Sequence, residues 1–242
     1  WGPVFKLHEV GAYYTTIGFG SITLSTGTNN RAIYVARMDG GGNVLWAVST
    51  GTGRGLGIAP DGAGGCFVTG YYYGSATFGS TTLTSARGSG NSYQWASEDV
   101  FVWALDATGA SRWAISWATS SSPPRRDYGY GIAADGEGGA LVTGYFDAPF
   151  TSAGTDPPNS NQGPPSADAF VRRVDSEGRL IWSIRAGGNP NNHGYAVASD
   201  GVGGVLVTGD FKFTVSFGTT SLTTGNNYDA FVVRLALPPP PP

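Results

Sequence analysis

One pattern of seventeen residues recurs three times along the chain, and internal repetition of this kind limits the possible folds more than any other feature. The copies are GLGIAPDGAGGCFVTGY from Gly55, GYGIAADGEGGALVTGY from Gly129 and GYAVASDGVGGVLVTGD from Gly194. A second pattern precedes each copy and consists of an Asp, a Gly three residues later and a Trp seven residues later. It runs from Asp39 to Trp46, from Asp106 to Trp113 and from Asp175 to Trp182. The chain is therefore expected to fold as an array of similar units.

Each unit reads as short β-strands joined by tight turns. Runs such as AIYVARM and AFVRRV (strand A) are rich in β-branched and aromatic residues and have the length of a strand. The Asp-x-x-Gly link leads to strand B, as in GRLIWSI. Strand C, as in GYGIA, leads through a DGxGG link to strand D, as in LVTGY, and a Phe-Gly strand follows. Asp bonds its own backbone and Gly accepts positive φ, so both links predict hairpin turns. No segment of about ten residues shows a helical period.

Four or five antiparallel strands per unit match a propeller blade with long loops. We predict an all-β fold, a β-propeller-like array of antiparallel blades with about four blades. The propeller covers residues 1–237, with units starting near residues 55, 129 and 194 and a partial unit at 1–54. A polyproline tail covers residues 238–242. By this count three units hold strands A to D, and the fourth lacks strands B and C.

The combined pattern DAFVxRxDxxGxLxW followed by GxAxxxDGxGGxxVTG resembles the bacterial seven-bladed β-propeller repeat (SBBP) family. The resemblance extends from Gly11 to Ala236 and implies a propeller fold. The copy number departs from the family, because about three and a half to four repeats do not build seven blades. Ala32 also replaces the aspartate that leads strand A in the later units.

Composition argues against nucleic-acid and membrane partners. The net charge is −3, the lysines are Lys6 and Lys212, and there is no basic run to displace phosphate counterions. No apolar stretch approaches the roughly 18 residues that span a bilayer. The single cysteine, Cys66, occupies the position of Ala140 and Val205 in the other copies, which predicts a small buried side chain rather than a reactive thiol.

Patterns for catalysis and metal binding are weak. His8 and His193 are the two histidines, and no Gly-x-Ser-x-Gly motif accompanies them. One cysteine and two histidines do not make a zinc site. We expect no enzymatic activity, no cofactor and no metal. Neither histidine is expected within hydrogen-bonding reach of both a nucleophile and a carboxylate.

Most aspartates occupy repeat positions. Those in the two kinds of turn are explained by turn chemistry: Asp39, Asp106, Asp175, Asp61, Asp135 and Asp200. Asp99, Asp168 and Asp229 lead strand A in three units. An alternative interpretation makes these three a calcium or glycan site at equivalent blade edges, although no Asp-x-Asp-x-Asp-Gly loop supports calcium.

Aromatic residues outside the repeat template are the candidates for ligand binding, because exposed rings suit sugars or a partner surface. The candidates are Tyr71, Tyr72, Tyr73, Tyr93, Trp95 and Tyr145. Since alternate residues of a strand face opposite sides, one or two of the three consecutive tyrosines are expected to face solvent. The alternative is that these rings cover blade edges. The recurring Trp46, Trp113 and Trp182 are predicted to be buried at equivalent positions.

The last strand A, Asp229 to Leu235, is expected to present an unpaired edge. The candidate assembly residues are Phe231, Val233, Leu235, Pro238 and Pro240. Two ways of covering the edge remain open. The N-terminal run VFKLHEV closes a four-bladed ring, or a neighbouring molecule adds head to tail and builds a filament.

These observations favour a non-enzymatic, extracellular or cell-surface module with a structural or adhesive role, including that of a filament subunit. Its expected partners are other copies of itself or neighbouring surface proteins. The proline run is similar in composition to linkers of algal hydroxyproline-rich surface glycoproteins. The alternative is a lectin-like propeller that binds glycans, and a hydrolase or lyase on a propeller comes third.

Overall fold

The computed structural model describes residues 7–27, 31–86, 97–118, 126–147, 167–187 and 191–236. These residues form seventeen β-strands and no helix, which confirms the all-β prediction. Within these ranges there is accordingly no helix that is long and apolar enough to cross a membrane. Tyr93, Trp95, Pro238 and Pro240, for which the sequence predicts roles, lie outside the described residues.

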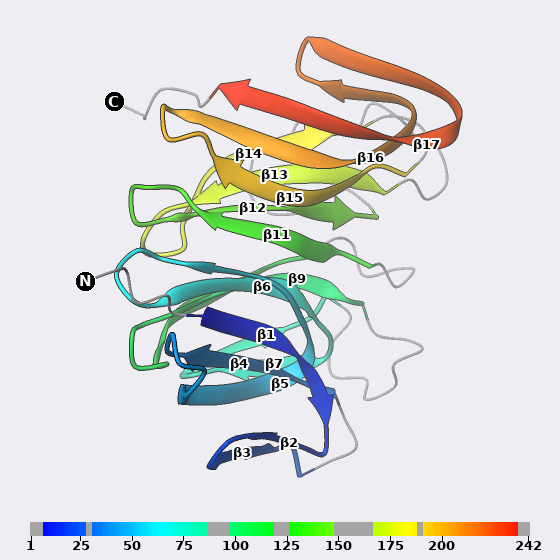
Figure 1. Ribbon diagram of the computed structural model, residues 1–242. Helices are drawn as coiled ribbons and strands as arrows, with labels where there is room; N and C mark the ends of the chain where they lie inside the picture. The colour runs from blue at the N-terminus through cyan, green and yellow to red at the C-terminus, as the bar shows by residue number, and fades with distance from the viewer. Residues whose placement is uncertain are drawn as a thin grey trace.

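The strands form four antiparallel blades that follow one another from the blue to the red end of the chain (Figure 1). Blade 1 consists of β1 (Leu7–Tyr14), β4 (Arg31–Met38) and the first half of β5 (Val44–Pro60). Blade 2 consists of the second half of β5, β6 (Cys66–Tyr72), β9 (Asp99–Leu105) and β10 (Ser111–Trp117). Blade 3 consists of β11 (Tyr128–Ala134), β12 (Ala140–Phe146), β13 (Asp168–Val174) and β14 (Leu180–Ala186). Blade 4 consists of β15 (His193–Ser199), β16 (Gly204–Phe217) and β17 (Thr220–Ala236).

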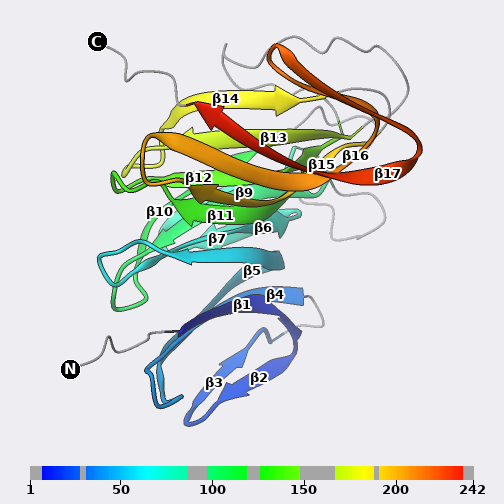
Figure 2. The same ribbon diagram turned by 45° about the horizontal axis from the view of Figure 1, so that its top comes forward.

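The Phe-Gly segments form hairpins that project from the blades between strands D and A. They are β2 (Thr16–Phe19) with β3 (Ile22–Ser25), and β7 (Ser75–Phe78) with β8 (Thr81–Thr84). In blade 4 the corresponding hairpin continues directly from the long strands β16 and β17, as the view of the top of the molecule shows (Figure 2).

The sheets group the strands in the order C, D, A, B, which corrects the count made from the sequence. Strand B and the strand C that follows it belong to different sheets, because β5 bends from one blade into the next. Thr52 still pairs with Ala32 of β4, whereas Gly53 pairs with Tyr72 of β6. Blades 2 and 3 therefore have four strands. Among the described residues, blade 1 has no strand C and blade 4 has no strand B.

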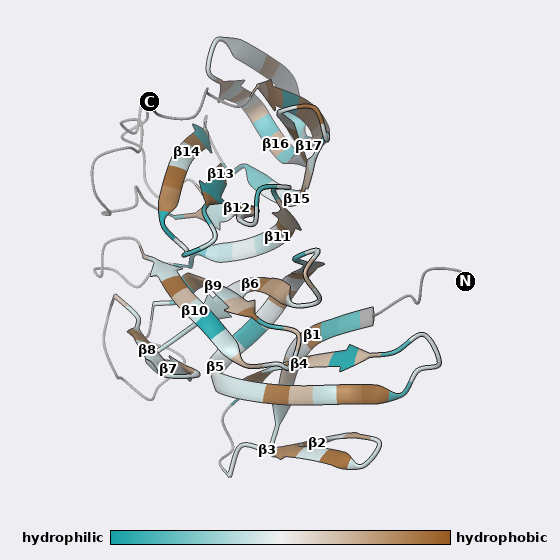
Figure 3. Ribbon diagram, turned by 90° about the vertical axis from the view of Figure 1, so that its left-hand side faces the viewer, coloured by the Kyte–Doolittle hydropathy of each residue, from teal (hydrophilic) through white to brown (hydrophobic). Residues whose placement is uncertain are grey.

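The hydrophobic core lies between successive blades, because both faces of an inner sheet are covered. In β9, Phe101 packs toward blade 1 and the next residue, Val102, packs toward blade 3. Alternation along a strand produces this division. Brown, hydrophobic bands accordingly mark the strands, for example β5, β10 and β14 (Figure 3). The hairpins join these cores on the side of the preceding blade, where Phe78 packs against Phe101.

The repeated tryptophans link one blade to the next. The indole N–H of Trp46 donates to the carbonyl of Ala107 at 3.0 Å, and that of Trp113 donates to the carbonyl of Ser176 at 2.7 Å. Both acceptors lie in the A–B turn of the following blade. Trp182 is buried as predicted, but Trp46 and Trp113 are only half-buried. The rings of Trp46 and Trp113 lie against Gly109 and Gly178 of the next blade's turn, and these glycines have no side chain to cover them.

Candidate functional site

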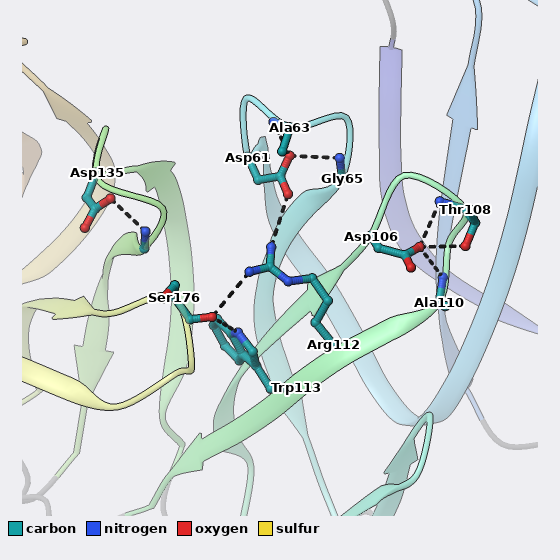
Figure 4. A network of polar contacts seen from close by, with 11 residues as sticks. Asp61, Ala63, Gly65, Asp106, Thr108, Ala110, Arg112, Trp113, Asp135 and Ser176 are labelled. Atoms are coloured by element: carbon teal, nitrogen blue, oxygen red, sulfur yellow. Dashed lines mark hydrogen bonds and ion pairs between the residues drawn. The ribbon is translucent and has the colours of Figure 1, made fainter.

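The two ends of the blades have different chemistry. One end carries the A–B and C–D turns with their aspartates, shown in Figure 4. Each turn aspartate accepts two backbone N–H groups; Asp61, for example, binds those of Ala63 and Gly65 at 2.8 Å each. Backbone N–H donors from Val202 and Gly204 likewise hold the pKa of Asp200 below its usual value. These contacts agree with the turn interpretation of the aspartates.

An arginine pairs with the second carboxylate oxygen of each C–D turn aspartate. In blades 3 and 4 it comes from strand A of the same blade: Arg173 binds Asp135 at 2.9 Å, and Arg234 binds Asp200 at 2.6 Å. Blade 2 has Ala104 at this position of strand A. There Arg112 of β10 supplies the charge, 3.2 Å from Asp61, and also donates to the carbonyl of Ser176 (Figure 4). This end of the molecule is thus occupied by structural contacts.

The three aspartates that lead strand A do not converge on one site. Asp99 is buried and accepts the backbone N–H of Ala86 at 2.6 Å, and burial raises its pKa to about 7. Asp168 is buried beside Arg185, with which it forms an ion pair. Asp229 is exposed and accepts a hydrogen bond from Thr224. The described residues contain no group of three His, Cys, Asp or Glu that could hold a metal ion.

The opposite end of the blades carries a continuous line of rings that crosses three blades. We call it the aromatic row: Tyr71, Tyr128, Tyr145, Tyr130, His193 and Tyr195. Tyr71 of blade 2 stacks on Tyr128 of blade 3 with ring centroids 4.4 Å apart. Within blade 3, Tyr128 lies 5.2 Å from Tyr145. Tyr145 then contacts His193 of blade 4 at 4.8 Å, and Tyr130 contacts Tyr195 at 5.4 Å.

Charged side chains flank the aromatic row along its length. Arg31 of blade 1 donates to the hydroxyl groups of Tyr71 and Tyr14, each at 2.8 Å. In blade 4, the carboxylate of Asp210 accepts the hydroxyl of Tyr195 at 3.0 Å and lies 2.7 Å from Nδ1 of His193. The row therefore extends by polar contacts to Tyr14, so that it touches all four blades.

Burial raises the pKa of four tyrosine hydroxyls in the row above the usual range, those of Tyr128, Tyr130, Tyr145 and Tyr195. For Tyr128 the hydrogen bond that its hydroxyl donates to Glu98 adds to the effect, and for Tyr195 the bond to Asp210 does the same. Neutral phenols are hydrogen-bond donors. The row thus offers uncharged aromatic faces with carboxylates and a guanidinium beside them, a combination that suits polyhydroxylated ligands.

Of the predicted ligand-binding tyrosines, the structure brings together Tyr71 and Tyr145. Tyr72 lies on the other face of β6, fully buried against Phe78, and Tyr73 is buried as well. The expectation that one or two of the three consecutive tyrosines face solvent is wrong, because Tyr128 of the next blade stacks on Tyr71. The exposed members of this surface are Tyr14 and Tyr195, with exposed fractions of 54 % and 45 %.

Sequence reasoning missed three members of the row, Tyr128, Tyr130 and Tyr195, and also Arg31 beside it. A signal for two of them existed. Tyr130 and Tyr195 occupy the same place in the repeat, one residue after the glycine that begins strand C. Their alignment in the repeat predicts neighbouring positions in successive blades.

Other candidate chemistry is sparse. His193 contacts the carboxylate of Asp210 and the rings of Tyr145 and Tyr195. No serine or cysteine contact to His193 occurs among the described residues. Cys66 is buried, and its pKa is raised to about 12, first by burial and then by the nearby charge of Asp61. The prediction of a small buried side chain at Cys66 is confirmed.

A second surface of interest is the face of blade 4 that points away from blade 3. At one repeat position of strand A, Val35, Val102 and Val171 are no more than 1 % exposed, whereas Val232 is 76 % exposed. Leu206 of β16 is exposed too, although its equivalents Phe67 and Leu141 are buried. We call Leu206, Val232 and Arg234 the open face of blade 4.

The alternation of buried and exposed side chains along β17 corrects the expected assembly residues. Phe231 is buried in the core between blades 3 and 4, and Val233 and Leu235 pack against that core. Because alternate residues point to opposite faces, Val232 and Arg234 are the side chains presented outward. The backbone edge of β17 has no strand beside it within the described ranges. The N-terminal run does not cover it, since Leu7–Tyr14 pairs with β4 in blade 1.

No family model matches the chain. Over 131 residues, 50 % of this chain, it is 28 % identical to the "Uncharacterized WD repeat-containing protein L264" of Acanthamoeba polyphaga mimivirus. The matched segment is 9 % of that protein, so the chain spans a small part of this relative's length. Fold and similarity together define a repeat protein of the β-propeller type. Membership of the SBBP family stays a prediction.

Proposed function

We propose that this chain is a non-catalytic β-propeller module with a structural or adhesive role outside the cell or at its surface. It assembles head to tail with further copies of itself or with neighbouring surface proteins through blade 4. The observation that carries the proposal is the exposure of Val232, whose three repeat equivalents are buried by a following blade. Blade 4 keeps the apolar residue of an interior blade but has nothing packed on it among the described residues.

Blade 1, at the other end of the array, presents a surface of the kind that packs on the open face of a preceding blade. Within the molecule, blade 1 receives the back of blade 2 together with its hairpin, whose Phe78 packs into the joint core. Blade 1 has the same parts on its own back face, where Phe19 of its hairpin packs on Tyr34 with ring centroids 5.2 Å apart. Blade 1 of one copy would therefore meet blade 4 of another as successive blades meet. A contact between two different surfaces propagates and builds a filament.

Sedimentation velocity over a range of protein concentrations tests the proposal. The expected result is growth of species larger than the 25.0 kDa chain as concentration rises. Val232→Asp should remove that growth, because a charge at the contact cannot be buried without a partner. The matched control is Val202→Asp, which changes an equally exposed valine in a C–D turn outside the open face. A strictly monomeric chain at all concentrations would contradict the proposal.

A second candidate function is glycan binding, and the aromatic row favours it. Exposed rings beside carboxylates and a guanidinium bind sugars by stacking and hydrogen bonding. Screening on a glycan array would identify a ligand, and Tyr195→Ala should abolish that binding. Leu45→Ala, an exposed apolar residue on blade 1, is the control. Binding that survives Tyr195→Ala would place the glycan elsewhere, and Trp95→Ala then tests the other predicted ring.

A further inference from the structure

Blade 1 has an unpaired edge on the side where the other blades have strand C. β1 pairs with β4 from Leu7↔Met38 to Tyr14↔Arg31, and no other described strand pairs with it. The equivalent strands of blades 2, 3 and 4 are β6, β12 and β16. Each of them has a strand C beside it, namely β5, β11 and β15. This edge differs from that of β17 in position and in the kind of strand that is missing.

A glycine in β1 keeps the space that a strand C requires. In blades 2, 3 and 4, a side chain on the strand D glycine would overlap a carbonyl oxygen of strand C; the glycines are Gly70, Gly144 and Gly209. Each strand C bulges at this point. Gly11 occupies the same position in β1, but there the atoms nearest to an added Cβ belong to the ring of Tyr34, at 2.8 Å, and not to a strand C carbonyl. Among the described residues, no strand lies on the side of β1 where the other blades have strand C.

Arg37 marks where the missing turn would lie. Its equivalents Arg173 and Arg234 use Nε to bind the aspartate of their own C–D turn, at 2.9 and 2.7 Å. Arg37 is 4 % exposed, and one terminal nitrogen donates to the carbonyl of Ala107 at 2.7 Å. Its Nε is buried without a hydrogen-bond partner among the described residues. A buried, unpaired donor on a cation carries a cost that a carboxylate would remove.

Two grooves lie along β1 where strand C and its turn would run. One, of about 480 Å³, is lined by Val10, Gly11 and Tyr34 together with Arg54 of β5. The other, of about 420 Å³, lies at the opposite end of the strand and is lined by His8, Arg37 and the turn 62–65. Together they provide room at both ends of the strand for an extended backbone and its turn.

We propose that the inner edge of β1 is a docking site for an extended segment of the strand C type, Gly-x-Gly-Ile-Ala-x-Asp-Gly. The segment adds antiparallel to β1, its bulge passes Gly11, and its aspartate pairs with Nε of Arg37. The proposal does not depend on the open face of blade 4, because the two sites lie at opposite ends of the array (Figure 1). Main-chain hydrogen bonds provide the affinity of such strand addition, and side-chain contacts provide its specificity.

The test uses a fluorescent peptide with the sequence of residues 128–139, YGYGIAADGEGG, titrated into the whole chain and followed by anisotropy. Saturable binding with one peptide per chain is expected. Replacing the peptide's aspartate by Asn (Asp135→Asn) should weaken binding about tenfold or more, as loss of a charge-assisted bond does. This arm leaves the protein unchanged and so cannot fail through misfolding. Hydrogen exchange should show slower exchange of the β1 amides when the peptide is bound.

The protein-side variant is Arg37→Leu, checked for folding by circular dichroism, with Arg37→Lys as a second variant that keeps the charge but lacks Nε. In either variant, the difference in affinity between the Asp and Asn peptides should disappear. Arg234→Leu, at the same repeat position in blade 4, should leave that difference intact. The proposal is overturned by absence of saturable binding, by equal affinity of the two peptides, or by binding that Val232→Asp abolishes and Arg37→Leu does not.

Discussion

Blades 1 and 4 each have three strands within the described residues, yet the two ends of the array are exposed to very different degrees. The back face of blade 1 is covered by its own hairpin β2–β3, which buries Phe19, Tyr34 and Ala36. The open face of blade 4 is not covered by any of the described residues, and Val232 is exposed on it. The strands that are absent from the described residues also differ, since blade 1 has no strand C there and blade 4 has no strand B.

This difference follows from the order of elements in the repeat. The hairpin comes between strands D and A, and in blades 2 and 4 it packs on the side of the preceding blade, as Phe78 and Phe217 show. A first blade therefore carries its own cover, whereas a last blade depends on whatever comes next. Arrays of repeats commonly need such a cap at each end to stay soluble. The two ends of this array are therefore not interchangeable, because only blade 1 carries its own cover within the described residues.

The largest expected effect concerns the strand D glycines. Gly144→Ala should destabilise the chain by about 3 kcal/mol or more, because its Cβ would overlap the backbone carbonyl of Tyr128 and strand C would have to move. Gly11→Ala should cost less, about 1 to 2 kcal/mol, since the nearest atoms belong to the side chain of Tyr34 and not to a backbone. Urea unfolding of the two variants measures the difference. Equal costs would mean that blade 1 already has a backbone beside Gly11.

The next effect compares one residue type at one repeat position. Val102→Ala should cost about 2 to 3 kcal/mol, because the side chain is buried between blades 2 and 3 and the substitution leaves a cavity. Val232→Ala should change the free energy of unfolding by less than about 0.5 kcal/mol in the monomer. Thermal and urea unfolding at low protein concentration would compare them. A large cost for Val232→Ala there would show that blade 4 is covered even in the monomer.

A third prediction concerns Asp99 and its repeat equivalent Asp168. Asp168 has Arg185 beside it, whereas Ser116 stands at the corresponding place in blade 2. Burial holds the pKa of Asp99 near 7, above its value of about 3.8 in the unfolded chain. The stability that the protonated form contributes is present below pH 4 and is lost as pH rises toward 7. Relative to Asp99→Asn, the wild-type chain should therefore lose about 3 kcal/mol between pH 4 and pH 7.

Unfolding curves of wild type and Asp99→Asn at several pH values provide the measurement. Asp200→Asn is the contrasting control, because the pKa of Asp200 is lowered by backbone donors. For Asp200 the contribution to stability is present above pH 4 and disappears as pH falls below it. Parallel pH profiles of wild type and Asp99→Asn would refute a raised pKa at Asp99.

The smallest effect concerns the tryptophan links between blades. Trp113→Phe should cost about 1 kcal/mol beyond the change in packing, because it removes the hydrogen bond to Ser176. Trp182→Phe should lose nothing of this kind, since its indole nitrogen has no acceptor among the described residues. Leu237 has the repeat position that Ala107 and Ser176 have as acceptors, and it lies outside those residues. Chemical unfolding of both variants tests the pair, and an equal loss would mean that Trp182 is also hydrogen-bonded.

The repeat pattern predicted the strands and turns well because these depend on local chemistry. Asp61, Asp135 and Asp200 bind the backbone of their own turns, and such contacts span only four residues. The aromatic row was only partly predictable. Tyr71 and Tyr145 stood out in the sequence, but their stacking partner Tyr128 comes from the segment between them, and only packing of blade on blade brings the three together.

The sequence by itself determined the all-β class, the hairpin turns and the burial of Cys66, since a β-branched run, an Asp-Gly turn and a repeat position each carry that information locally. Only the tertiary structure decided that strand B and the following strand C belong to different blades, because both groupings satisfy the same local pattern. It also decided which side of β17 is open. A shift by one residue exchanges the two faces of a strand, so the position of the neighbouring blade alone makes Phe231 buried and Val232 exposed.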